Sequence, residues 1–66
     1  MQIILNGQPH ECVAGSTLAA LLAETGHAQR RVAVEVNREI VPRSQQIRKA
    51  LAEGDRVEII HAVGGG

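Results

Sequence analysis

The stretch Val32-Ala33-Val34-Glu35-Val36-Asn37 decides the fold, because valines alternate in it with other residues. Successive side chains of a β-strand point to opposite faces, so the three valines share one side. Ala33, Glu35 and Asn37 share the other side. The stretch therefore predicts a half-buried strand in a sheet that a second layer covers on one face.

The chain before this strand begins with a predicted hairpin. Gln2–Asn6 is typical of a strand, and its run of apolar residues indicates a central place in the sheet. Asn6-Gly7 is the favoured pair for a two-residue turn, since both positions tolerate positive φ. Pro9–Val13 is expected to return along an edge of the sheet, because Pro9 has no backbone donor.

A helix is predicted next. Ser16 is the preferred N-cap, with Thr17 as the alternative. Gly26 is expected to end the helix in a left-handed conformation. Leucines at helical spacing define its apolar stripe: Leu18, Leu21 and Leu22.

The chain after the alternating strand predicts short elements and a last strand. Glu39–Pro42 is a short extended piece, Ser44–Leu51 favours a single helical turn or a 3₁₀ piece, and a turn follows at Glu53–Asp55. Arg56–Val63 is a strand with Val57, Ile59, His61 and Val63 on one side.

This order of elements predicts an α+β domain in two layers, with one main helix across one face of a mixed sheet of four to five strands. The helix is expected to return the chain to a strand parallel to an earlier one. Residues 1–63 are expected to form the domain, and 64–66 a flexible glycine tail.

The face of the sheet away from the helix is less polar than a fully solvated face. It is expected to carry Ile4, Ala33, Glu35, Glu58, Ile60 and Ala62. Exposed apolar patches on small proteins often mark partner sites, so Ile60, Ala62 and Glu58 form a candidate partner face. The alternative is that Ile60 is an isolated surface apolar residue, which is normal.

The sequence ends in Gly64-Gly65-Gly66. Glycine has no Cβ, so such a segment can enter a slot too narrow for other residues. Three extended residues reach roughly 10 Å, which would place a terminal carboxylate inside another protein's active site. A frayed end or a glycine-rich scar is the alternative.

Composition argues against several classes of function. The chain has no Phe, Tyr or Trp, and its seven basic and seven acidic residues cancel, so neither nucleic acid nor a membrane is an expected partner. Cys12 is the single cysteine, and no signal peptide is visible, so a cytoplasmic setting is expected.

Sites for metals and phosphates are not expected either. No phosphate-binding loop motif is present. His10 and Cys12 share one face of a strand, but one histidine and one cysteine make a weak metal signal. Cys12 could act as a nucleophile, but a small core residue is favoured, since nothing nearby in sequence would lower its pKa.

Taken end to end, the chain resembles the small β-grasp (ubiquitin-like) sulfur-carrier proteins, most closely those of the ThiS family of thiamine biosynthesis. The resemblance rests on Ile3–Gly7, on the segment Val32–Arg43, on the segment Leu51–Ile60 and on the final Gly65-Gly66. The segment Val32–Arg43 together with the di-glycine end is the most specific part. This chain has a third glycine, Gly64, although the family pattern requires only two.

The resemblance implies a chemistry at Gly66. In the family, an E1-like enzyme uses ATP to adenylate the terminal carboxylate, and a sulfur-donor enzyme then helps convert it to a thiocarboxylate. Thiazole synthase takes the sulfur for the thiazole ring of thiamine. Gly64 and Gly65 would be the threading arm. The chain itself would be a protein cosubstrate and not an enzyme, and its partners would bind the ATP.

Proteins with other functions share this fold. The small subunit of molybdopterin synthase uses the same tail chemistry, but those chains are usually longer and often contain aromatic residues. Carriers for tRNA thiolation or cysteine synthesis, and a conjugating ubiquitin-like modifier, are also open. A β-grasp interaction module with an inert tail is the alternative from another class.

Overall fold

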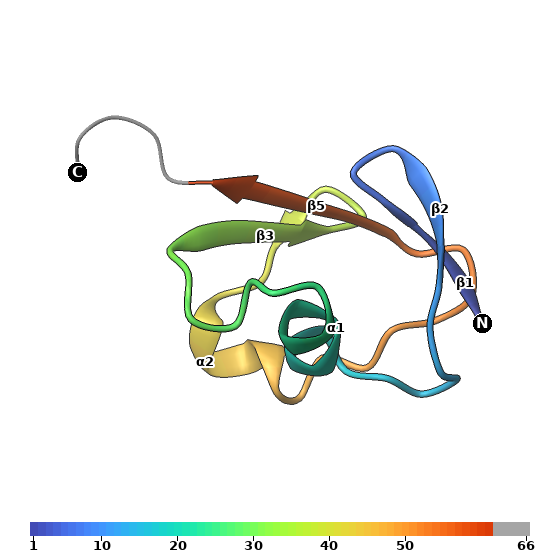
Figure 1. Ribbon diagram of the computed structural model, residues 1–66, viewed down its shortest axis with the longest axis horizontal. Coiled ribbons are helices and arrows are strands. Elements are labelled where there is room, and N and C mark those ends of the chain that lie inside the picture. Colours follow the sequence, from blue (N-terminus) through green and yellow to red (C-terminus); the bar gives the residue numbers. More distant parts are fainter. Residues whose placement is uncertain (62–66) are drawn as a thin grey trace.

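The computed structural model describes residues 1–61, which form a sheet covered on one side by two helices (Figure 1). Within these residues the strands are β1 (Gln2–Leu5), β2 (Gln8–Glu11), β3 (Val32–Val36), β4 (Glu39–Ile40) and β5 (Arg56–His61). The helices are α1 (Leu18–Glu24) and α2 (Arg43–Gln46). The predicted two-layer α+β architecture with one main helix is confirmed, with five strands in the sheet.

The strand order is β2-β1-β5-β3-β4, so the last strand in sequence lies at the centre of the sheet. β5 runs parallel to β1 and antiparallel to β3. Because β1 and β2 are antiparallel, β3 runs in the same direction as β2. The strand after α1 is thus parallel to an earlier strand, as predicted, but it pairs with β5 and not with that strand.

The first hairpin follows the sequence signal. Asn6 and Gly7 have φ values of 50° and 82°, and Leu5 pairs with Gln8 across them. Both residues are therefore in the left-handed region that a tight two-residue turn needs. β2 is an edge strand, as Pro9 predicts, but it ends at Glu11 and not at Val13.

The start of α1 corrects the sequence prediction. Thr17, and not Ser16, is the N-cap, and its Oγ1 accepts a hydrogen bond from the backbone N–H of Ala20 at 3.1 Å. The hydroxyl of Ser16 donates instead to the carbonyl of Val13, which closes the preceding turn. Gly26 follows the helix with φ 83°, as predicted.

The core lies between α1 and the covered face of the sheet. Its buried side chains come from the predicted leucine stripe, from the alternate residues of β3 and β5, and from β1 and Leu51. α2 is a single four-residue turn, as predicted for this part of the chain, but it spans Arg43–Gln46 and not Ser44–Leu51. The buried hydrophobic residues are Ile3, Leu18, Leu21, Leu22, Val34, Val36, Leu51, Val57 and Ile59.

Asp55 fixes the register at which β5 begins. One carboxylate oxygen accepts the backbone N–H of Ala52 at 2.8 Å, and the other accepts the side-chain amide of Asn37 at 3.0 Å. Asn37 and Arg38 form the β3–β4 turn with φ values of 52° and 70°. The Asn37 side chain also accepts the N–H of Arg56 at 2.9 Å. Two turns that are distant in sequence are thus joined at the start of β5.

Candidate partner-docking face

The face of the sheet that the helices leave uncovered is here called the outer face. On it Ala33 pairs with Ile60, and Glu35 pairs with both Glu58 and Ile40. Ile60 is 45 % exposed and Ile40 is 60 % exposed. The outer face comprises Ile4, Ala33, Glu35, Ile40, Arg56, Glu58 and Ile60.

Two carboxylates lie opposite each other in the middle of this face. Glu35 on β3 and Glu58 on β5 are direct cross-strand partners. Like charges in this position destabilise a sheet by a few tenths of a kcal/mol. Within residues 1–61 neither carboxylate has a cation within salt-bridge distance. Arg56 lies at the other end of the same face, so the side near Glu35 and Glu58 is the part suited to a partner that brings positive charge between apolar contacts.

The far half of β5 extends beyond its parallel neighbour. β1 pairs with β5 only at Arg56 and Val57, because β1 turns away at Asn6. The side chain of Asn6 takes over and accepts the N–H of Ile59 at 2.8 Å. At Ile60 and His61, β5 is therefore paired with a neighbouring strand on one side only, and that strand is β3. These two residues come directly before residues 62–66.

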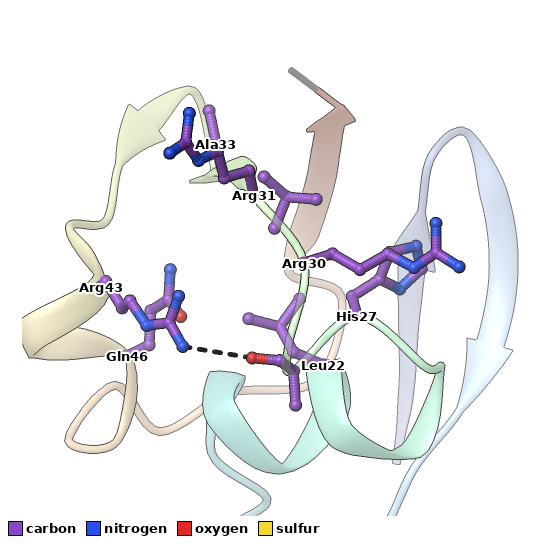
Figure 2. Close-up of a pocket in the computed structure, with 9 residues that line it drawn as sticks. Leu22, His27, Arg30, Arg31, Ala33, Arg43 and Gln46 are labelled. Carbon is purple, nitrogen blue, oxygen red and sulfur yellow. Dashed lines mark hydrogen bonds between the residues drawn. The ribbon is translucent and has the colours of Figure 1, made fainter. Parts of the chain in front are cut away.

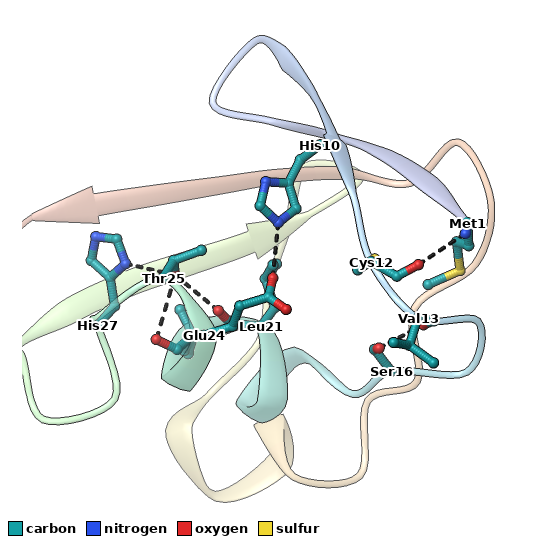
Figure 3. Close-up of polar contacts among 10 residues, drawn as sticks. Met1, His10, Cys12, Val13, Ser16, Leu21, Glu24, Thr25 and His27 are labelled. Carbon is teal, nitrogen blue, oxygen red and sulfur yellow. Dashed lines mark hydrogen bonds and ion pairs between the residues drawn. The ribbon is translucent and has the colours of Figure 1, made fainter.

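Two histidine rings meet where the end of β5 lies next to the loop after α1. The rings of His61 and His27 lie 5.2 Å apart between centroids, at 51°. The hydroxyl of Thr25 lies 2.9 Å from Nδ1 of His27 and donates to the carbonyl of Leu21 (Figure 3). The sequence reasoning missed this contact. The one available signal was the strand parity that places His61 on the covered side.

His10 and Cys12 have separate partners in the structure. Nε2 of His10 lies 3.0 Å from a carboxylate oxygen of Glu24 on α1 (Figure 3). Cys12 is half-buried and packs against the core. Burial raises the pKa of its thiol above the ordinary value, which disfavours the reactive thiolate. No group of three or more potential metal ligands occurs in the region 1–61.

The structure describes two residues of the expected site. Glu58 and Ile60 lie on the outer face of β5, as expected from strand parity. Ala62, Gly64, Gly65 and Gly66 lie outside the described residues, as does the expected domain boundary at residue 63. None of the helices in the described part of the chain is long and apolar enough to cross a membrane.

A mixed sheet that wraps around one main helix and leaves its other face open defines a β-grasp domain. The model of the ThiS family matches residues 3–66. The chain belongs to the ThiS family.

Solved structures and curated relatives agree with this assignment. The crystal structure of the thiamine biosynthesis protein ThiS from Geobacter metallireducens superposes with a TM-score of 0.87 at 30 % identity, covering 100 % of both chains. The sulfur carrier protein ThiS of Escherichia coli is 35 % identical over 66 residues and is matched over its full length.

Two further relatives are longer proteins. The thiazole synthase of Magnetococcus marinus is 46 % identical to this chain over 66 residues, and that of Paramagnetospirillum magneticum is 44 % identical. All of this chain is matched, but it spans only 20 % of the length of either protein. A ThiS-like segment therefore forms part of both thiazole synthases.

Proposed function

We propose that this protein is a sulfur carrier of thiamine biosynthesis and that the carboxylate of Gly66 carries the sulfur. The observation that carries the proposal is membership of the ThiS family over residues 3–66, a match that includes Gly65 and Gly66. The full-length relative in Escherichia coli bears the name sulfur carrier protein.

The proposed chemistry starts from an unreactive group. A terminal carboxyl group has a pKa of about 3.5, so it is an anion at neutral pH and a poor electrophile. An E1-like enzyme would transfer the adenylyl group of ATP to the Gly66 carboxylate and release pyrophosphate. Hydrosulfide supplied by way of a donor enzyme would then attack the acyl carbon and release AMP. The product is a thiocarboxylate on Gly66.

The chain would act as a protein cosubstrate, with ATP and the sulfur donor bound by its partners. The sequence contains no phosphate-binding loop motif to hold ATP itself. Thiazole synthase is the proposed sulfur acceptor. Support comes from the two thiazole synthases that contain a segment similar to this whole chain, since fusion keeps a carrier and its acceptor together.

The outer face is the proposed docking surface for the E1-like enzyme. Ile60 and Glu58 lie on the strand that leads directly into the glycine segment. Because β5 is the central strand, a partner seated on it would hold the residues that follow in a fixed direction. Ala62, Gly64 and Gly65 would extend this surface into the partner's active site.

Mass spectrometry tests the proposal. The native protein is incubated with ATP, an E1-like enzyme and a sulfide source, and its intact mass is compared before and after. An oxygen-to-sulfur exchange is expected, located on Gly66 by fragmentation. Location matters because oxidation of Met1 or Cys12 gives nearly the same mass gain.

The control is a Gly66→Ala variant, which is expected to remain folded but unloaded. An unchanged mass, with the same enzyme shown to load another carrier, would overturn the proposal. A gain that does not lie on Gly66 would overturn it as well.

A further inference from the structure

A hollow of about 380 Å³ opens on the helix layer, between α2 and the loop that joins α1 to β3 (Figure 2). Its apolar part includes Leu22 and Val32, and three guanidinium groups line its polar part. In Figure 2 the side chains of Arg31 and Arg43 lie on the same side of the hollow as Gln46, whereas Arg30 extends past His27 in the other direction.

Charge is unevenly distributed around this hollow. Of the seven basic residues, three line it, namely Arg30, Arg31 and Arg43, whereas Arg48 and Lys49 line a separate hollow together with Glu39. No carboxylate lines the hollow, and within residues 1–61 the single ion pair is that of His10 with Glu24, elsewhere in the molecule. Cations gathered without counter-charges attract an anionic ligand, although the net charge of the protein is zero.

Gln46 adds a polar group that is nine-tenths buried. Its side chain is 8 % exposed and reaches the hollow from α2. Nε2 donates to the carbonyl of Val41 at 3.3 Å, while Oε1 accepts no hydrogen bond from residues 1–61 and is accessible from the hollow. This oxygen is positioned to accept a backbone N–H from a segment lying in the hollow.

A second hollow of about 160 Å³ continues from the first and shares Leu22, Ala28, Arg43 and Gln46 with it. It leads to Ala19 and to Ile47, which is 69 % exposed. Arg43 lies between the two hollows and donates to the carbonyl of Ala28 at 3.3 Å (Figure 2). We call the two hollows together the arginine groove.

The length of the groove distinguishes between possible occupants. A compact anion would use only the arginine end and would leave Ile47 exposed. An extended peptide segment uses both ends, because acidic side chains can meet the guanidinium groups while an apolar side chain covers Ile47. The combination of cations, an accessible amide oxygen and an exposed isoleucine favours the peptide.

We propose that the arginine groove binds an extended acidic segment of a partner protein. Carboxylates of the segment pair with Arg31 and Arg43, its backbone donates to Oε1 of Gln46, and an apolar side chain packs on Ile47. The groove lies mainly on the helix layer and meets the outer face at Ala33. The binding does not depend on chemistry at Gly66.

A titration of the ¹⁵N-labelled full chain tests the proposal. The probe is a capped peptide with glutamate or leucine at every second position and serine between them, so that both residue types share one face when it is extended. The controls are the same peptide with glutamine in place of glutamate, and inorganic phosphate. The acidic peptide is expected to shift amide signals of residues 27–32 and 43–47. The shifts are expected to weaken as salt is raised, because the groove is open to solvent.

Charge-reversal variants sharpen the test. Arg31→Glu is expected to weaken binding about tenfold or more, since hydrogen bonds between charged groups contribute strongly. The matched control is Arg38→Glu, in the β3–β4 turn and outside the groove, which is expected to change affinity less than about twofold. Arg43→Lys keeps the charge and is expected to lie between them.

Three results would overturn the proposal. The first is the absence of shifts at millimolar acidic peptide. The second is equal binding of the glutamine peptide, which would show that binding needs only apolar contacts and no negative charge. The third is that inorganic phosphate matches the affinity and shift pattern of the acidic peptide, which would make the groove a site for small anions.

Discussion

Ile59 and Ile60 are neighbours on β5, and they belong to two different surfaces. Ile59 is 6 % exposed in the core, whereas Ile60 is 45 % exposed on the outer face. The covered face of β3 and β5 carries only valine and isoleucine over residues 34–59, while the outer face adds two opposed glutamates. The two faces share one backbone, so the difference comes from side-chain choice alone.

The difference teaches what each face is for. The side chains of the covered face are already buried against α1, so this face has little surface left for a partner. The outer face has exposed isoleucines and a pair of like charges. Selection for stability alone would be expected to replace them. Features that cost stability on an otherwise well-packed sheet are most simply explained by a partner.

The largest expected effect separates the two isoleucines directly. Ile59→Ala is expected to lower the free energy of unfolding by about 2–5 kcal/mol, because it leaves a cavity in the core. Ile60→Ala is expected to cost less than about 1 kcal/mol, since little buried surface is lost. Urea unfolding followed by far-ultraviolet circular dichroism measures both. Should Ile59→Ala fail to fold, Ile59→Val against Ile60→Val gives the same comparison, and equal costs would contradict it.

The separation of the faces depends on the register of β5, which Asp55 helps to fix. A slip of one residue would exchange the covered and outer side chains. Asp55→Ala removes two hydrogen bonds, to Ala52 and Asn37, and is expected to cost about 1–2 kcal/mol. Thermal unfolding measures the loss. Glu11→Ala is the control, because this exposed carboxylate has no side-chain hydrogen bond within residues 1–61, and a similar cost there would remove the special role of Asp55.

Ile60→Glu tests the outer face as a docking surface. It is expected to weaken binding to the E1-like enzyme about tenfold, because a charge replaces a buried apolar contact. Stability should change by less than about 1 kcal/mol. Isothermal titration calorimetry measures the affinity, and Val13→Glu, an exposed apolar residue in a loop, is the matched control. If both variants bind equally well, the docking surface lies elsewhere.

The smallest expected effect concerns the paired glutamates. Glu35→Gln is expected to stabilise the protein by about 0.2–0.5 kcal/mol, because it relieves the repulsion from Glu58. The same variant is expected to weaken docking if the partner is basic. High salt should abolish the gain in stability. A loss of stability in low salt would show that the pair is not repulsive.

Much of the architecture was predictable from the sequence because its signals are local. The alternation in Val32–Val36, the Asn6-Gly7 turn and the leucines at helical spacing each correspond to an observed element. The choice between Ser16 and Thr17 as N-cap was wrong because tertiary contacts decide it. Thr17 forms an isolated bridge with Ala50, a residue 33 positions later, and this fixes where the helix begins.

The candidate site was predictable in part. Strand parity places Glu58 and Ile60 on the outer face, as the sequence suggested. Two features depend on distant residues that meet only in the fold. These are the contact of His27 with His61 and the arginine groove, which joins a loop to α2. No local pattern brings Arg31 near Arg43. The expected roles of Gly64, Gly65 and Gly66 stay predictions.

Methyl NMR tests the central claim, that the outer face is the docking surface. The chain has six isoleucines, and each of its surfaces contains at least one of them. Ile4, Ile40 and Ile60 report on the outer face, Ile3 and Ile59 on the core, and Ile47 on the arginine groove. The protein with labelled isoleucine methyl groups is titrated with the E1-like enzyme. The account predicts that the signals of Ile60 and Ile40 change most while those of Ile59 and Ile47 stay in place. Changes at Ile47 with an unaffected Ile60 would contradict it.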